Sequence, residues 1–197
     1  EGTRIDSRHV NPRFELNGVP KDFDNGEFSS DLCVDFIGEF MTKHKEEPMF
    51  IYYPMVLPHC PFVPTPGNPD FDPKSLGSPT YKGDPKYFKN MIEYVDFTVG
   101  KVEKRVIELG IANNTLIIFT GDNGTDKPIK TKWSGTTVVG AKGKLVEAGV
   151  RVPLIIKFPG KAKEGLVTDQ LVDFSDFLPT FCELAGVEFP KDKIDGE

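Results

Sequence analysis

Apolar residues recur along the chain in two patterns, one typical of helices and one typical of strands. Between residues 85 and 109 they follow one another at spacings of mostly three and four, which is the period of one helix face. Asp84-Pro85 is a typical helix start and Gly110 a typical stop. Similar patterns predict helices over 30–46, with Ser30 as N-cap, and over 175–185, with Ser175 as N-cap.

Short, nearly all-apolar runs lie between these helices. They are MFIYY at 49–53, TLIIF at 115–119 and PLIIKF at 153–158, with a weaker candidate, TTVV, at 136–139. Such runs are typical of strands that are buried on both faces. Their alternation with helices predicts an α/β fold with a mostly parallel central sheet and helices on both faces. Residues 1–28 and 54–85 show no clear period, and we expect loops there.

Composition and charge narrow the classes of function. The 197 residues are 38% hydrophobic and 27% charged, which is typical of a globular domain. The net charge of −6 is spread along the chain without a Lys/Arg block, so no nucleic-acid partner is expected. No apolar run approaches the ~20 residues that cross a bilayer, so no membrane partner is expected. The three cysteines form no C-x-x-C pair and predict free thiols.

An acid–amide pair, Asp122-Asn123, follows the predicted strand at 115–119. In parallel α/β sheets, ligands bind beyond the carboxyl ends of the strands. Carboxylate and amide oxygens are hard ligands that suit Ca²⁺ or Mg²⁺. Asp-Asn-Gly is also an ordinary turn sequence, and two ligands do not complete a calcium shell of about six to eight oxygens. From the residues alone, a metal site and a plain turn both stay open.

Two further positions could carry chemistry. His59 lies between Pro58 and Pro61 after the predicted strand at 49–53, where it could transfer protons near neutral pH or be a loop residue without a role. Lys142 lies between small residues in GAKGKLVEAG and could contact an anionic group, or be a solvated charge. Lys144 could take the same role. Neither a G-x-S-x-G motif nor a phosphate-binding glycine loop occurs.

Four segments, taken in order, resemble the type I, formylglycine-dependent sulfatases of the alkaline phosphatase superfamily. They are FIYYPMVLPHCPF at 50–62, YVDFTVGKVEKRVIELGIANNTLIIFTGDNG at 94–124, GAKGKLVEAGVRVPLIIKFPG at 140–160 and LVDFSDFLPTFCELAGVEFP at 171–190. The resemblance implies an arylsulfatase-like sulfuric ester hydrolase. It makes Asp122 and Asn123 two ligands of one divalent cation, usually Ca²⁺. It makes His59 the residue that protonates the leaving alcohol and Lys142 a contact of the sulfate, so both are expected to be catalytic and substrate-binding.

The family also implies a substrate and a compartment. The substrate would be a sulfated small molecule or a sulfated glycan, whose identity the sequence leaves open. The location would be periplasmic, secreted or lysosomal.

The family's nucleophile has no counterpart in these residues. Formylglycine arises within C-x-P-x-R or S-x-P-x-R, and neither motif occurs in the 197 residues. The earlier pair of metal-binding aspartates is also absent. We therefore expect the central and C-terminal part of a sulfatase catalytic domain, with 1–28 as a loop or an excursion from the core and 29–197 as an α/β core that is incomplete at both ends. By itself, the chain is expected to hydrolyse no sulfate ester and to bind calcium weakly or not at all.

Two alternatives stay open. The chain could be a non-catalytic, sulfatase-like binding protein, because the nucleophile is missing. It could also belong to a phosphonate or phosphate ester hydrolase of the same superfamily, although LPHCPF and GAKGKLVEAG resemble sulfatases more closely.

Overall fold

The computed structural model describes residues 8–188, 191–193 and 195–196. The chain divides into two compact units, residues 1–162 and 163–197, which are described separately. Residues 1–7 of the expected N-terminal loop, and residues 189–190, 194 and 197 of the expected core, lie outside the described residues.

Two long helices are the main elements of the first unit. They are α1 (Ser29–His44) and α2 (Phe88–Glu108), and a single 3-10 turn, η1 (Pro85–Tyr87), precedes α2. The Asp84 carboxylate caps this turn by accepting a hydrogen bond from the Lys86 amide at 3.0 Å. Both predicted helices are confirmed, but the N-cap of α1 is Phe28 rather than Ser30. Phe28 is buried in the core, and the helix begins at Ser29, one residue before the predicted start at residue 30.

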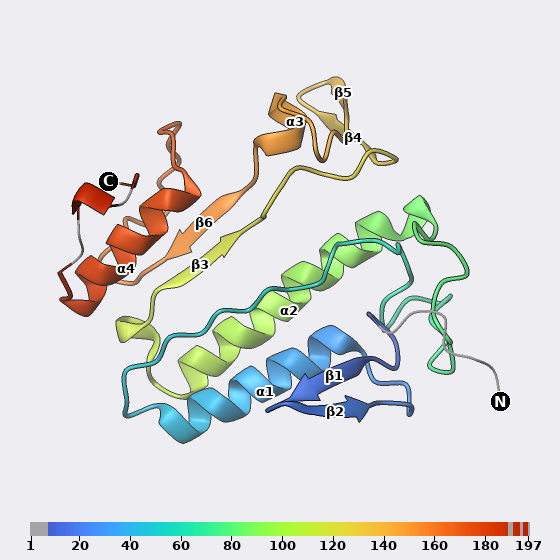
Figure 1. Cartoon of the computed structure of the whole chain (residues 1–197), viewed down its shortest axis with the longest axis horizontal. Helices are drawn as coiled ribbons and strands as arrows, with labels where there is room; N and C mark the ends of the chain where they lie inside the picture. The colour runs from blue at the N-terminus through green and yellow to red at the C-terminus, as the bar shows by residue number, and fades with distance from the viewer. Residues whose placement is uncertain (1–7, 189–190, 194, 197) are drawn as a thin grey trace. The chain divides into compact units, whose positions relative to one another are not determined.

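The two helices lie side by side, as Figure 1 shows, and polar as well as apolar contacts join them. The Tyr94 hydroxyl donates to Asp31 at 2.5 Å, and the Lys101 ammonium lies 3.2 Å from both Asp31 and Asp35. A cluster of Ile37, Met41 and Val106 fills one end of the contact. A larger cluster around Phe62, Met91 and Tyr94 forms the main core. Burial of Tyr94 and its bond to Asp31 raise the pKa of the Tyr94 hydroxyl.

The chain from 49 to 62 follows α2 backwards along its length (Figure 1). Met49 and Tyr53 pack near Val106, and Phe62 packs beside Met91. The predicted strand at 49–53 is wrong, because within the described residues this segment pairs with no other strand. Phe50 and Tyr52 are 71% and 80% exposed, so only one side of the run packs on the helices.

The other two predicted strands form and pair with each other. β3 (Ile117–Thr120) and β6 (Leu154–Lys157) run antiparallel, with Ile117 opposite Lys157 and Thr120 opposite Leu154. The expected parallel pairing is therefore wrong for these two strands. A parallel pair needs a crossover, usually helical, whereas the chain between them holds a hairpin and a single helical turn, α3 (Glu147–Val150), and returns in the opposite direction.

Two β-hairpins account for the remaining described strands. β1 (Arg13–Leu16) pairs with β2 (Val19–Asp22), and β4 (Lys130–Trp133) pairs with β5 (Thr136–Val139). Their turns, Asn17-Gly18 and Ser134-Gly135, have positive φ at both positions, which is the geometry of a type I′ turn. The stretch 1–28, expected as a loop or an excursion from the core, thus contains a hairpin at 13–22, and β5 confirms the weak candidate at 136–139. Residues 54–84 contain no helix or strand, as expected.

The second unit contains the last predicted helix. The 3-10 turn η3 (Phe174–Asp176) leads into α4 (Phe177–Ala185), and Gly186 ends it in the left-handed conformation. The cap is Asp173, whose carboxylate accepts from the Ser175 amide at 2.9 Å, so Ser175 is not the N-cap. Two short 3-10 turns, η2 (Ala112–Asn114) in the first unit and η4 (Lys191–Lys193) in the second, complete the described elements.

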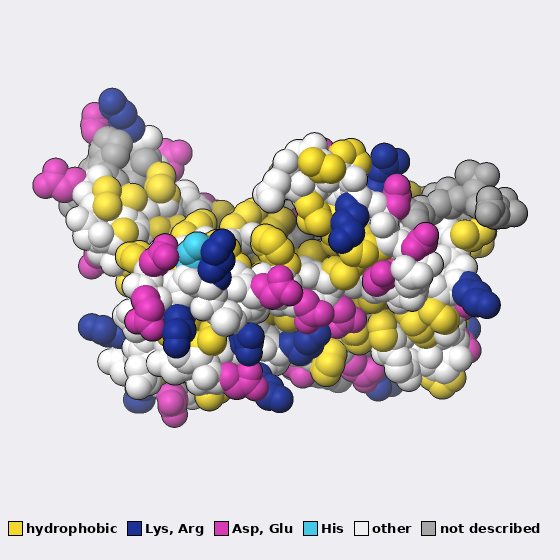
Figure 2. All heavy atoms as spheres, turned by 90° about the horizontal axis from the view of Figure 1, so that it is seen from below, with side chains coloured by type: hydrophobic (Ala, Val, Ile, Leu, Met, Phe, Trp, Pro, Cys, Tyr) yellow, Lys and Arg dark blue, Asp and Glu magenta, His cyan; other side chains and the backbone are white. Residues whose placement is uncertain are grey.

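The described surface is mixed in character. Figure 2 shows one face on which acidic and basic side chains are interspersed with apolar ones. None of the described helices combines the length and apolarity that crossing a bilayer requires. The three cysteines are free, as predicted, and Cys60 is buried while Cys33 and Cys182 are half-buried.

Candidate functional site

His59 lies exposed on the loop that follows the 49–53 run, and the backbone oxygen of Cys60 holds its ring. Its Nδ1 is 2.6 Å from the backbone oxygen of Cys60. Since a carbonyl oxygen only accepts, this geometry assigns the hydrogen to Nδ1 and leaves Nε2 to gain or release a proton. Arg8 donates to the same oxygen at 2.7 Å and reaches within 3.4 Å of Nδ1. The ring is thus positioned through Nδ1 while Nε2 stays available for proton transfer.

Asp122 and Asn123 lie directly beyond the carboxyl end of β3. Asp122 is exposed, Asn123 is half-buried, and neither side chain hydrogen-bonds within the described part of the chain. Their oxygens are the donor type that calcium takes, but they supply only two of about six to eight ligands. The described residues contain no group of three or more His, Cys, Asp or Glu side chains placed to hold a metal ion. The pair therefore fits one part of a calcium site.

The loop that carries this pair packs against residues 140–149 by direct backbone contact. The Gly124 amide donates to the Gly149 oxygen at 2.9 Å, and a Cβ at Gly124 would lie 2.2 Å from the Ala148 oxygen. A Cβ at Gly140 would lie 2.0 Å from the oxygen of Asp126. Side chains cannot fit at either glycine without moving backbone, so these contacts fix the position of the loop.

Lys142 lies on the facing segment. Its amide donates to the Thr125 oxygen at 3.0 Å, which ties it to the loop of Asp122 and Asn123. The Lys142 residue is half-buried, whereas Lys144 is exposed. The positive charge of Lys142 acts on the carboxylate of Asp126, four residues after Asp122. Lys142 is therefore placed beside the predicted metal-binding loop.

An ion pair joins the loop of His59 to the loop of Asp122. Lys82 pairs with Asp126, 44 residues further along the chain, and the Lys82 ammonium lies 3.9 Å from the Cys60 sulfur. The hydrogen bond to Asp126 raises the pKa of Lys82. Burial acts to raise the pKa of Asp126, but the hydrogen bond from Lys82 and the other favourable contacts outweigh it and lower that pKa. Both groups are therefore charged at neutral pH.

The structure thus connects the four predicted site residues through two that the sequence did not indicate. Contacts run from His59 through Cys60 and Lys82 to Asp126 on the Asp122 loop, and the Lys142 amide bonds to Thr125 on the same loop. Sequence reasoning missed Arg8, Lys82 and Asp126. Only Asp126 carried a local signal, because it lies on the same loop as the predicted ligands.

Comparison with solved structures shows that the chain shares an α/β fold with known proteins. The crystal structure of Ps i-CgsB matches with a TM-score of 0.67 and 26% identity, over 86% of this chain and 37% of that one. The same protein in complex with k-i-k-neocarrahexaose matches with a TM-score of 0.64 and 25% identity, over the same shares. The α/β fold class predicted from the sequence is confirmed.

The chain belongs to the sulfatase family, because the family model described as Sulfatase matches residues 5–187. Arylsulfatase A of Homo sapiens is 32% identical over 171 residues, covering 86% of this chain and 30% of the relative. Steryl-sulfatase of Rattus norvegicus is 29% identical over 80% of this chain and 26% of its own length. N-acetylgalactosamine-6-O-sulfatase of Bacteroides thetaiotaomicron is 33% identical, over 68% of this chain and 26% of the relative. The chain thus spans about a quarter to a third of these relatives.

Proposed function

We propose that the chain is part of the catalytic domain of a calcium-dependent sulfuric ester hydrolase. The family match over residues 5–187 is the observation that carries this proposal. In it, Asp122 and Asn123 supply oxygen ligands to the cation, Lys142 contacts the sulfate, and His59 protonates the departing alcohol. The bound cation would supply positive charge to stabilise the sulfuryl oxygens.

The placement of His59 supports its role as a general acid. The bond from Nδ1 to the Cys60 oxygen orients the ring. A protonated Nε2 could then transfer its hydrogen to the oxygen that leaves with the alcohol. Such a transfer helps because an alkoxide is a poor leaving group unless it gains a proton as the bond to sulfur breaks.

Lys142 would contact the sulfate, and the Lys82–Asp126 pair would hold the loops that carry the site. Lys142, half-buried and attached to the Asp122 loop through Thr125, offers a point charge to a sulfate oxygen. The ion pair keeps the loop of His59 at a fixed place relative to the loop of Asp122. Lys82 and Asp126 are thus positioning residues, because they act through the residues around them.

Two experiments test this proposal. The purified 197-residue chain should hydrolyse 4-methylumbelliferyl sulfate no faster than its His59→Ala variant, since the chain contains no formylglycine motif. A longer natural polypeptide that contains these residues and such a motif should lose most activity on His59→Ala, Lys142→Ala or Asp122→Ala. His44→Ala, near the end of α1, is the matched control and should retain activity. Full activity of the Asp122→Ala enzyme would remove the metal assignment.

Titration of the chain with Ca²⁺ gives a readout that is independent of activity. We expect amide shifts to change only at millimolar calcium, if at all, because two oxygen ligands make a weak site. Micromolar binding that persists in Asp122→Ala would place the cation elsewhere and contradict the proposal.

The missing nucleophile motif favours a second candidate, a non-catalytic protein that binds sulfated glycans. A reading frame with a C-x-P-x-R segment upstream of Glu1 would remove this candidate. The names of the relatives suggest sulfated sugars as well as aryl and steryl sulfates as substrates, and the solved complex contains an oligosaccharide. A parallel assay with an aryl phosphate diester and a phosphonate ester would test the remaining superfamily chemistry.

A further inference from the structure

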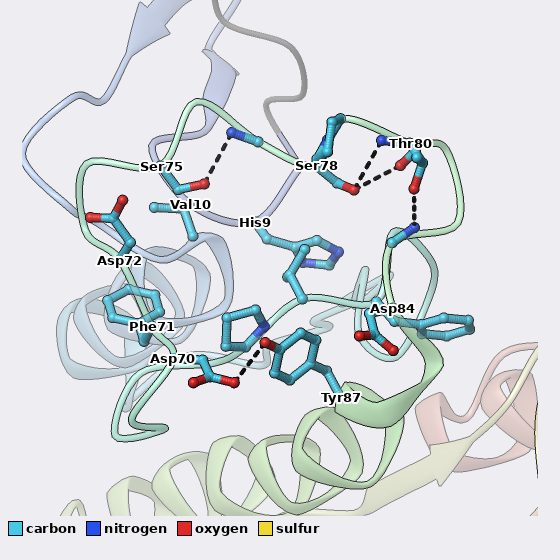
Figure 3. A pocket seen from close by; sticks show the side chains of 16 residues that line it. His9, Val10, Asp70, Phe71, Asp72, Ser75, Ser78, Thr80, Asp84 and Tyr87 are labelled. Carbon is cyan, nitrogen blue, oxygen red and sulfur yellow. Dashed lines mark hydrogen bonds between the residues drawn. The ribbon is translucent and has the colours of Figure 1, made fainter.

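A cavity of about 400 Å³ opens among the loops that carry His9, Phe71, Ser78 and Asp84 (Figure 3). One wall is apolar and includes Val10, Phe62 and Phe71. The opposite wall is polar, and its hydroxyl groups belong to the turn that contains Ser78 and Thr80. The volume lies within the range of small-molecule sites, which is about 300–1,000 Å³. An apolar wall that faces hydroxyl groups suits a flat, polyhydroxylated ligand.

The charge of the cavity is negative. Asp70, Asp72 and Asp84 line it, and its described lining contains neither Lys nor Arg. Each carboxylate accepts a bond within the protein, from the Tyr87 hydroxyl to Asp70 at 2.7 Å and from backbone amides to the other two. The Lys86 ammonium also lies 3.4 Å from Asp70 and 3.9 Å from Asp84, so three carboxylates face one ammonium and the net charge stays negative. A carboxylate has about four acceptor positions, so each retains capacity for a ligand. These acids would accept hydrogen bonds from hydroxyl groups and repel a second anion.

The cavity begins directly beside the candidate active site. Three short stretches of chain lead from the surroundings of His59 and Cys60 to the cavity wall. Arg8, which contacts His59, is followed by His9 in the wall, and Lys82, which contacts Cys60, is followed by Gly83. The Cα atoms of His59 and Phe62 are at most about 11 Å apart, since the chain takes three steps from one to the other. One ligand could therefore reach both places.

The sign of the charge changes between these two places. Arg8, Lys82 and Lys142 lie on the side of His59, although Asp126 balances Lys82. On the side of the cavity, the three carboxylates outnumber the ammonium of Lys86, which pairs with Asp70 and Asp84, so the net charge there is negative. An extended ligand with one anionic end and one uncharged end matches this distribution. A ligand that is anionic along its whole length does not.

We propose that this cavity binds an uncharged sugar ring joined to the sulfated residue of a glycan, and that it discriminates against a uronate at this position. This inference rests on the proposed function, because it takes the sulfate to lie at His59 and Lys142. The ring would lie against the apolar wall with its hydroxyl groups toward the carboxylates and the Ser78–Thr80 turn. The site thereby selects sulfated glycans whose neighbouring ring carries no negative charge.

The test measures binding of desulfated probes to the 197-residue chain by amide NMR. Neoagarotetraose, which is uncharged, should shift the amides of Gly77, Ser78 and Gly83. A non-sulfated chondroitin tetrasaccharide, which carries carboxylates, should bind roughly tenfold more weakly because of repulsion by the acidic wall. Asp72→Asn, which keeps an acceptor for its turn, should narrow this difference mainly by improving chondroitin binding.

An occluding variant adds a second measurement. Val63→Trp fills the cavity and should abolish the shifts, whereas Val139→Trp on β5, outside the cavity, should preserve them. The amide spectrum shows whether the Val63→Trp variant is folded. If it is not, the binding of the two probes to Asp72→Asn decides between the outcomes. Absence of neoagarotetraose binding, or equal binding of both probes, would overturn the inference. Since neither probe carries sulfate, these outcomes are independent of the hydrolysis tests.

Discussion

The contact between Gly124 and residues 148–149 predicts a large effect from the smallest possible side chain. In Gly124→Ala, the new methyl group would lie 2.2 Å from the Ala148 oxygen and 2.8 Å from the Gly149 carbon. Both are backbone atoms, so neither can rotate away as a flexible side chain would. The variant must move one loop from the other, and the bond from the residue 124 amide to the Gly149 oxygen is then stretched or lost.

The magnitude follows from these two changes. Forcing a methyl group into a packed contact costs about 1–3 kcal/mol. Losing one backbone hydrogen bond adds about 0.5–1.5 kcal/mol. Together they weaken the association of the two loops by about 1.5–4.5 kcal/mol, the sum of these two ranges. At about 1.4 kcal/mol per factor of ten, the population with the loops apart rises roughly 10- to 2,000-fold.

The Lys142 amide reports this opening, because it donates to Thr125 across the same contact. Its hydrogen exchange should accelerate by the same factor in Gly124→Ala. Gly100→Ala is the matched control, since Gly100 is an exposed position of α2 where a methyl group meets no atom within 4 Å. That change should leave Lys142 exchange unaltered and stabilise the helix by up to about 1 kcal/mol. Unchanged Lys142 exchange in Gly124→Ala would refute the close contact.

Tyr94→Phe removes the hydroxyl that donates to Asp31 between α1 and α2, and it should lower the free energy of unfolding by about 1.5–3 kcal/mol. Tyr52→Phe, at an 80% exposed position, should have no effect in the same urea titration. Asp126→Asn removes the ion pair with Lys82 and should cost less than about 1 kcal/mol at pH 7, as is usual for partly exposed pairs. Because the folded state lowers the pKa of Asp126, this contribution is present above the usual carboxyl pKa of about 3.9 and disappears as the pH falls through the lower folded value. A difference from wild type that grew in acid would contradict this sign.

The helices could be predicted from the sequence because their signals are local. The apolar period over 85–109 and the Asp84 cap both act within a few residues, and the structure contains the helix they indicate. The strands were harder, since an apolar run says nothing about its partner. Residues 49–53 and 117–120 look alike in sequence, yet only the second pairs, and its partner runs antiparallel. The hairpin at 13–22 was missed although Asn17-Gly18 is a strong turn signal.

In the candidate site, too, local signals could be predicted from the sequence and long-range contacts could not. Residue type and position after a strand picked out Asp122 and Asn123, and family resemblance gave His59 and Lys142 their expected roles, which stay predictions. No local pattern could indicate that Lys82 meets Asp126, because the pair joins residues 44 positions apart. The sign change between the His59 side and the cavity likewise depends on loops that meet only in three dimensions.

The β4–β5 hairpin has a consequence for the order in which the protein folds. It brings Gly140 back to Ile129, where the Gly140 amide donates at 2.9 Å, so the loops of Asp122 and Lys142 meet through contacts that are short-range in sequence. Hairpins of this kind close within about 1–10 μs. The contact of Lys82 with Asp126 spans a longer stretch that includes all of α2, and closing a longer loop loses more chain entropy. During refolding of the complete chain, we therefore expect the Asp122–Lys142 half to form first, with His59 added when Lys82 docks.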